Sequence, residues 1–378
     1  MTFTAQTNPD RLRVDFTGSL LRPAHLHDVA VRYGRGEASE DELRRVQDEC
    51  IREVIGKQEA HGMPVVSDGE FRRANFQDSF GQAVTGFDAE PSTWEPKPLY
   101  DGKTPFRRVE SGPSGSGPAI VYRRPVTERL RLVRNVPLAE YRFASQVATR
   151  PVKVTLVGPD RISQRFEWET SQAVYAGLDE FVDDVAAIER QMLAELVQAG
   201  CPYVQLDEPG YTAYVDAPSL ARMRARGEDT DANLARSIAA TNAVLADLAD
   251  TTTAVHICRG NQTGGWHREG SYDAIAERLF GSLNCQRFLL EYDSERAGGF
   301  EPLRFVPKDR IVVLGLITTK LPELESVDYL QRRIDEASRY VPLAQLALSP
   351  QCGFGHFPED VQWRKLDRML ETAARVWR

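Results

Sequence analysis

The sequence predicts an α/β protein with the TIM (β/α)8 barrel fold. Short runs of β-branched and other apolar residues alternate with longer amphipathic segments, which is typical of βαβ units around a parallel sheet. The chain contains eight such runs, as many as a TIM barrel has strands. Polar residues follow most of the runs, and the carboxyl ends of the strands form the face at which TIM barrels carry out their chemistry.

The predicted elements follow one another in a regular order. The short apolar runs place the strands at Val14–Ser19, Val65–Glu70, Val152–Val157, Tyr203–Glu208, Thr253–Cys258, Arg287–Tyr292, Arg310–Leu316 and Leu343–Ser349. The amphipathic segments place helices at Asp41–His61, Leu178–Gly200, Asp231–Asp250, Tyr272–Phe280, Val327–Tyr340 and Pro358–Val376. Parallel strands need such crossover helices between them, so this order favours a single closed barrel.

The segment 75–150 interrupts the alternation after the second strand. It is rich in proline, contains the Gly- and Ser-rich stretch Ser111–Gly117, and continues into Ala119–Tyr122, which resembles a hairpin arm. We therefore expect one barrel domain over residues 1–378, with 75–150 as an inserted helical and hairpin excursion. The excursion would cover the barrel mouth or contact another subunit, so a homo-oligomer is one expectation.

Composition and charge narrow the functional class. The 378 residues carry a formal net charge of -8 and no long block of Lys and Arg, which argues against a nucleic-acid or anionic-membrane surface. The first residues lack the apolar core of a signal peptide, and no apolar stretch reaches the length of a membrane span. Five widely spaced cysteines argue against a disulfide framework. We expect a cytoplasmic protein without nucleic-acid or membrane partners.

Two residues of the fifth predicted strand indicate a metal site. A strand sends residues i and i+2 to the same face, so His256 and Cys258 project side by side. Cys352 follows the eighth strand and can supply a second sulfur, and imidazole with thiolates favours zinc over magnesium or calcium. Glu291 stands on the strand after His256 and is a candidate ligand. Each residue alone is more often a packing or ion-pairing residue, and their convergence at one barrel mouth favours the metal.

Acidic residues converge on the same end of the predicted barrel. Glu70 ends the second strand, and Asp207 and Glu208 end the fourth. A buried carboxylate is unfavourable unless it is paired or bound to a metal, so these acids need partners. Arg22 or Arg72 could supply ordinary salt bridges, and the ionised acids could also hold the ammonium group of a ligand.

Six motifs stand at predicted strand ends, in the order Phe16–Pro23, Ser67–Arg73, Gln205–Pro209, His256–Asn261, Glu291–Gly298 and Ser349–Gly355. Together they resemble the cobalamin-independent methionine synthase family, particularly its shorter, single-barrel members, over nearly the whole chain. The resemblance implies a zinc ion held by His256, Cys258, Glu291 and Cys352. It also implies that Ser19, Glu70 and Asp207 bind homocysteine, and we add Arg22 and Arg72 to the expected substrate-binding set.

The resemblance implies zinc-dependent transfer of a methyl or other alkyl group from a donor to a small thiol, most simply homocysteine to give methionine. A thiol of pKa about 8.5 is mostly protonated at neutral pH, and binding to zinc removes its proton. The donor stays open, because folate-dependent members have two barrels and because the segment Thr318–Glu325 differs from theirs. Alternatives are an epoxyalkane:coenzyme M transferase, a metal-free porphyrinogen decarboxylase-like barrel, and a non-enzymatic barrel with structural zinc.

Overall fold

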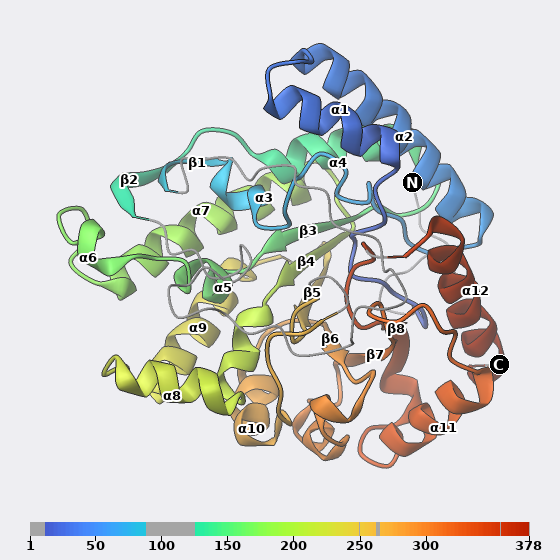
Figure 1. Cartoon of the computed structure of the whole chain (residues 1–378). Coiled ribbons are helices and arrows are strands. Elements are labelled where there is room, and N and C mark those ends of the chain that lie inside the picture. The colour runs from blue at the N-terminus through green and yellow to red at the C-terminus, as the bar shows by residue number, and fades with distance from the viewer. Residues whose placement is uncertain (1–11, 88–124, 249, 262–264, 356, 378) are drawn as a thin grey trace.

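The computed structural model describes residues 12–87, 125–248, 250–261, 265–355 and 357–377. At its centre lies a six-stranded parallel sheet in which each strand pairs with the next along the chain (Figure 1). The strands are β3 (Lys153–Val157), β4 (Tyr203–Asp207), β5 (Thr252–Ile257), β6 (Arg287–Glu291), β7 (Ile311–Ile317) and β8 (Leu346–Pro350). Each overlaps the strand predicted at that place.

Two further segments close the sheet into the TIM barrel that the sequence predicts. Val14 forms a single parallel bridge with Leu348 of β8, and Val66 forms one with Val152 beside β3. The two segments then meet each other, because the hydroxyl of Ser67 donates to a backbone carbonyl of the first segment (2.6 Å). The barrel is therefore complete, with its first two members reduced to bridges.

The prediction of full strands over Val14–Ser19 and Val65–Glu70 is thus wrong in extent. The backbone leaves the extended conformation in both segments, with positive φ at Gly18 (114°), Gly69 (69°) and Glu70 (60°). Such φ values do not continue a strand. Polar side chains that would have ended a regular strand instead lie on tight turns at the barrel mouth.

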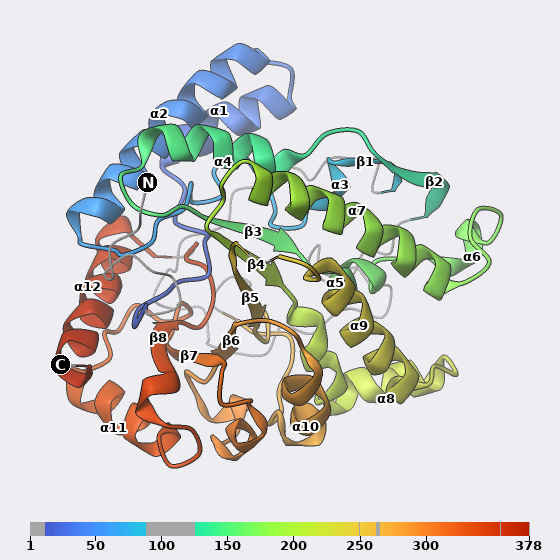
Figure 2. The same cartoon turned by 180° about the vertical axis from the view of Figure 1, so that it is seen from behind.

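Helices form the outer layer around the strands (Figures 1 and 2). The long ones are α1 (Ala24–Gly34), α2 (Glu40–Ala60), α4 (Val136–Val147), α7 (Leu178–Gln198), α9 (Thr230–Val244), α10 (Asp273–Ser282), α11 (Val327–Ala337) and α12 (Glu359–Val376). Shorter helices are α3 (Asp78–Gly81), α5 (Pro159–Ser163), α6 (Trp168–Ser171) and α8 (Ala217–Ala225), and the 3-10 turns are Pro209–Tyr214, Glu295–Ala297, Glu301–Phe305 and Leu343–Gln345. All six predicted helices are present, although α9 ends at Val244 and not at Asp250. Among the described helices, none is both long and apolar enough to cross a bilayer.

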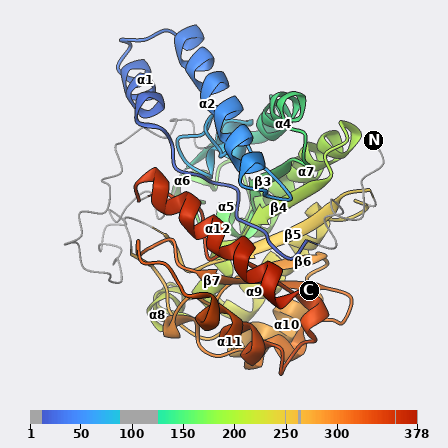
Figure 3. The same ribbon diagram turned by 90° about the vertical axis from the view of Figure 1, so that its right-hand side faces the viewer.

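The last helix closes the outer layer against the first part of the chain. In Figure 3, α12 runs across the near side of the barrel beside α2. Lys57 of α2 pairs with Glu359 of α12 (2.6 Å), and the His61 ring stacks on Trp363 with centroids 4.8 Å apart. These contacts join the two ends of the barrel sequence.

The segment 75–150, which interrupts the alternation of strands and helices, contains helices and an antiparallel strand pair among its described residues. Its described residues form α3, an antiparallel pair of β1 (Val84–Phe87) with β2 (Val126–Leu132), and α4. In Figure 1 the β1-β2 pair lies at the periphery, beside α6 and α7. The predicted hairpin arm Ala119–Tyr122 lies outside the described residues. Whether this excursion contacts another subunit stays a prediction.

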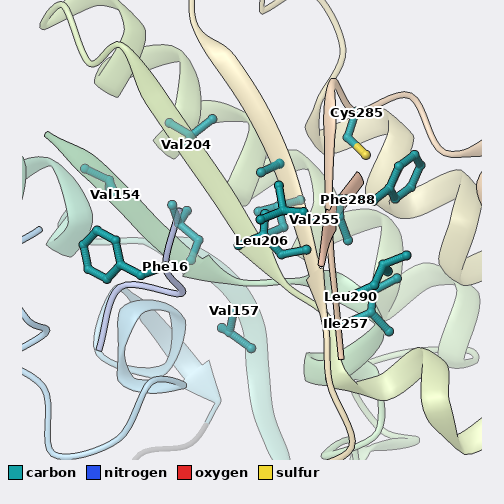
Figure 4. Close-up of a cluster of buried hydrophobic side chains, with 14 of the residues drawn as sticks. Phe16, Val154, Val157, Val204, Leu206, Val255, Ile257, Cys285, Phe288 and Leu290 are labelled. Atoms are coloured by element: carbon teal, nitrogen blue, oxygen red, sulfur yellow. The ribbon is translucent and has the colours of Figure 1, made fainter. Parts of the chain in front are cut away.

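Alternate residues of the strands occupy two environments. Apolar side chains such as Val204 and Leu206 of β4 belong to the hydrophobic core (Figure 4). The residues between them are polar and hydrogen-bond inside the barrel: Tyr203 donates to Oδ2 of Asp15 (2.6 Å), and Gln205 donates to a backbone carbonyl of the first segment (2.9 Å). On β4, the interior positions therefore form a column of polar side chains that continues up to Asp207 at the candidate site.

Candidate metal centre

Three predicted ligands come together at the carboxyl ends of the barrel strands. His256 lies on β5, Cys258 directly follows that strand, and Cys352 follows β8. One nitrogen of the imidazole and the two Sγ atoms all lie within 4.8 Å of one another, and the Sγ atoms are 3.8 Å apart. His256 and Cys258 are buried, and Cys352 is half-buried. This arrangement can hold a metal ion through one nitrogen and two sulfurs.

Two neighbours orient the imidazole of His256. Its Nδ1 lies 2.9 Å from Oδ1 of Asp207, which pairs with it in register on β4, and its Nε2 lies 3.2 Å from the carbonyl oxygen of Gln351. Burial lowers the pKa of His256, but Cys258 and Asp207 outweigh this effect and raise that pKa to about 10. A carboxylate behind the ring is the arrangement that fixes metal-binding histidines.

The two cysteines bind protons with different strength. A hydrogen bond with Cys352 lowers the pKa of Cys258 well below its ordinary value, and the neighbouring His256 adds to this effect against the influence of burial. The same hydrogen bond, reinforced by burial, raises the pKa of Cys352. A metal ion that binds all three side chains must therefore displace the protons of His256 and Cys352.

Glu291, the fourth predicted ligand, ends β6 and is fully buried, but it lies outside the group of three ligand atoms. Its Oε2 accepts from the backbone N–H of Arg259 (2.6 Å), and its Oε1 accepts from Nε of Arg296 (2.8 Å). Burial would raise the pKa of Glu291, but Lys320, Arg296 and Arg259 outweigh it and hold that pKa at about 2. The carboxylate stays ionised beside the cluster.

Ser19 and Glu70 form a second part of the site. The hydroxyl of Ser19 donates to Oε2 of Glu70, and Oε1 of Glu70 accepts from the hydroxyl of Thr155 (2.7 Å). The carbonyl of Ser19 accepts from the backbone N–H of Phe354 (3.1 Å), two residues beyond Cys352. Ser19 and Glu70 are thus linked through the backbone to the loop that carries Cys352.

Arg22 supports the unusual backbone of Glu70. The left-handed φ of Glu70 is uncommon for a residue with a side chain and needs surrounding contacts to persist. The backbone N–H of Glu70 donates to Oδ1 of Asp68 (2.9 Å). Nη2 of Arg22 donates to the backbone carbonyl of Glu70 (3.0 Å) and to that of Arg73 (2.7 Å). Arg22 therefore stabilises the main chain of the site through hydrogen bonds to two backbone carbonyls.

The structure does not bring Arg72, the remaining candidate for substrate binding, to the metal cluster. Its Nη2 pairs with Oδ1 of Asp48 on α2 (2.6 Å), and its guanidinium lies 4.7 Å from the ring centre of Phe143 on α4. Both partners belong to the outer helical layer. The salt bridge that was considered between Arg72 and Asp207 or Glu208 is therefore wrong, because the carboxylate partner of Arg72 is Asp48.

Residues that the sequence analysis did not assign also line the centre. Gln351 carries the carbonyl beside His256, and its Nε2 donates to Oγ1 of Thr319 (2.6 Å) after β7. The next residue, Lys320, is fully buried. At the other strands, candidate site residues were recognised as polar residues directly after an apolar run. The same pattern at the end of the seventh strand could have identified Thr319 and Lys320.

Comparison with known proteins agrees with this geometry. A family model described as the catalytic domain of the cobalamin-independent synthases matches residues 118–375, which is more than half of the chain. The chain belongs to the cobalamin-independent methionine synthase family. This confirms the resemblance inferred from the motifs at the strand ends.

The similarity to individual proteins extends over nearly the full length. The chain is 34% identical to the uncharacterised protein YxjH of Bacillus subtilis, covering 97% of this chain and 95% of that protein. It is 23% identical to the methionine synthase of Sulfurisphaera tokodaii, covering 94% and 89%. A solved structure of a candidate vitamin-B12-independent methionine synthase from Listeria monocytogenes matches with a TM-score of 0.74 at 26% identity, covering 97% and 98%.

Proposed function

We propose that this protein is a zinc-dependent methyltransferase that methylates the sulfur of homocysteine to give methionine. The observation that carries the proposal is the cluster of His256, Cys258 and Cys352 at the barrel mouth, together with the hydrogen-bonded pair of Ser19 and Glu70, which a backbone hydrogen bond links to the loop of Cys352. Family membership supports the reaction class, and a relative from Sulfurisphaera tokodaii bears the name methionine synthase. The same membership favours this function over the decarboxylase-like alternative.

The side chains present fit zinc. Two sulfurs and one imidazole nitrogen match the ligand types of catalytic zinc sites, in which three protein ligands leave a position for substrate. When bound, zinc would lower the pKa of the substrate thiol, so that its sulfur is a nucleophile at neutral pH. Glu291, ionised at the end of the neighbouring strand, is the fourth ligand that we propose, and it would be the one that gives up its position to the substrate sulfur.

The remaining residues would bind and orient the amino-acid end of the thiol. Glu70 and Asp207 carry carboxylates that suit an ammonium group, and the hydroxyl of Ser19 suits a carboxylate or an amine. In the reaction the thiol loses its proton, the bond between the methyl carbon and the donor breaks, and a sulfur–carbon bond forms. Holding the sulfur in line with that carbon would be the task of these side chains, since oriented reactants can lower a barrier by about 7–11 kcal/mol.

Metal analysis and a substrate panel test the proposal together. Protein purified without chelator should contain about one zinc, which Cys352→Ser should remove. Cys285→Ser should keep the zinc, because Cys285 lies in the hydrophobic core. The zinc-loaded enzyme should methylate homocysteine with a methyl folate or a methylcobamide. Ring opening of an epoxide by coenzyme M, without turnover of homocysteine, would replace the proposal by the transferase alternative, and fresh reduced protein without zinc would refute both.

A further inference from the structure

Lys320 carries a buried positive charge that the site so far described does not use. Its side chain is fully buried, and Nζ has no hydrogen-bond partner among the residues that the structure describes. Burying an ammonium group without a partner is strongly unfavourable. An unpaired buried cation of this kind is therefore a candidate to bind a negatively charged ligand at a functional site.

The backbone places Lys320 at the metal centre through its neighbour Thr319. The hydroxyl of Thr319 accepts from Nε2 of Gln351 (2.6 Å), which precedes Cys352, and from Nδ2 of Asn261 (2.9 Å), which follows Cys258 by three residues. The loop after β7 is thereby tied to both cysteine-bearing loops. Lys320 directly follows Thr319, so its backbone lies where these loops meet.

The charge of Lys320 acts on two acidic groups of the candidate metal centre, the carboxyl of Glu291 and the thiol of Cys352. It is the first of the cations that oppose burial and lower the pKa of Glu291, and it also acts on Cys352. The Glu291 oxygens, however, already accept from the backbone of Arg259 and from Arg296, and Arg296 also pairs with Asp293. The ammonium of Lys320 is therefore near enough to act on both groups, while no carboxylate among the described residues is hydrogen-bonded to it.

We propose that Lys320 is the counter-cation for the deprotonated sulfur of the substrate. The inference rests on the proposed function. The carboxylate of Glu291 is compensated by its ion pair with Arg296. A divalent ion with the thiolates of Cys258 and Cys352 would be neutral, so a substrate thiolate would add one uncompensated negative charge in a buried place. Lys320 supplies the matching positive charge from within the protein. It is a positioning residue, which favours binding of the substrate as a thiolate and takes part in no bond that forms or breaks.

The test compares two ligands whose charges differ only at the sulfur atom. Homocysteine can bind as a thiolate, whereas methionine has the same amino-acid end but a neutral thioether. Zinc-loaded wild-type protein, Lys320→Met and Lys320→Arg are titrated with each ligand by calorimetry, and their zinc content is measured. Lys320→Met should keep its zinc and bind homocysteine about tenfold or more weakly, with methionine affinity within about threefold. Lys320→Arg, which keeps the charge, should restore most of the homocysteine affinity.

Other results overturn the inference in distinguishable ways. Equal weakening for both ligands would assign Lys320 to the carboxylate of the amino acid, and unchanged homocysteine affinity would remove it from recognition. Loss of zinc from Lys320→Met would make it a structural element of the metal site. If Lys320→Met does not fold, Lys320→Gln repeats the comparison with a polar neutral side chain. Failure of the zinc-loaded wild type to bind either ligand would refute the proposed function itself.

Discussion

Replacing Asp15 by Asn tests whether charge compensation inside the barrel stabilises the fold. Asp15 accepts from Nζ of Lys153 (2.8 Å), from the hydroxyl of Tyr203 (2.6 Å) and from Nε of Arg287 (3.2 Å). The side chains of Asp15, Lys153 and Arg287 are all fully buried. Asn is close in shape to Asp but neutral, so the substitution leaves two buried cations with no anion between them.

The expected loss is large because both cations stay buried. Removing one partner of a buried ion pair costs about 3–5 kcal/mol, and a whole domain is stable by only about 5–15 kcal/mol. Equilibrium denaturation in urea should therefore show a free energy of unfolding about 3 kcal/mol or more below that of the wild type. Glu40→Gln is the matched control: it also removes one carboxylate from an ion pair, with Arg44 (2.7 Å), but both side chains are exposed and the change should stay below about 1 kcal/mol.

The dependence on pH gives a second measure of the same interaction. Burial raises the pKa of Asp15, but Lys153 and Arg287 outweigh it, so this pKa is lower in the folded protein than its ordinary value. A carboxyl with a lowered folded pKa stabilises the protein above the ordinary pKa of about 4 and loses this contribution as the pH falls through the folded value. Asp15→Asn should flatten that part of the stability profile. A variant as stable as Glu40→Gln, or with the wild-type acid profile, would refute the charge-compensation argument.

Three further outcomes follow from the site. Metal affinity, measured by chelator competition between roughly pH 6 and pH 8, should rise with pH by up to about 100-fold per pH unit. The reason is that the pKa values of His256 and Cys352 are raised, so that both side chains must lose a proton when the metal binds. A metal affinity that does not change with pH would contradict this. Glu70→Gln should keep its zinc and bind homocysteine about tenfold more weakly in calorimetry, and equal binding would exclude Glu70 from the ammonium site. Gly315→Ala should destabilise by about 1–3 kcal/mol in urea, because its Cβ would lie 2.8 Å from Cα of Gln351, whereas Gly56→Ala on the open face of α2 should not destabilise.

The parallel strands were predictable because their apolar residues are contiguous or alternate over short runs. Strands β3 to β8 all overlap their predicted ranges, as do the six predicted helices. The first two segments were not predictable as bridges, because the same residue types continue through Gly18 and Gly69 into turns that only the closed barrel requires. Local sequence shows where a chain can extend, but tertiary closure decides where it turns.

The ligands of the site were predictable where one strand carries two of them, and less so elsewhere. His256 and Cys258 share a face by the period of the strand, and Cys352 was a candidate because it follows the eighth predicted strand. The sequence could not show that Arg72 turns outward to Asp48, since that choice depends on helix α2 lying behind the barrel. Lys320 was overlooked because the segment Thr318–Glu325 was weighed only as a departure from the folate-dependent members, and its polar sequence does not show which residue is buried.

One strand shows how structure and function share the same alternation. On β4, Tyr203 braces Asp15 low in the barrel, Gln205 donates to Oδ1 of Asp207 (2.8 Å), and Asp207 holds the imidazole of His256 at the mouth. The residues between them, Val204 and Leu206, are core residues. Because successive interior positions are two residues apart, the orientation of the metal ligand rests on the same polar column that compensates the buried charges below. Substitutions at the base of this column should therefore change metal affinity as well as stability, whereas substitutions in the apolar layer should act mainly on stability.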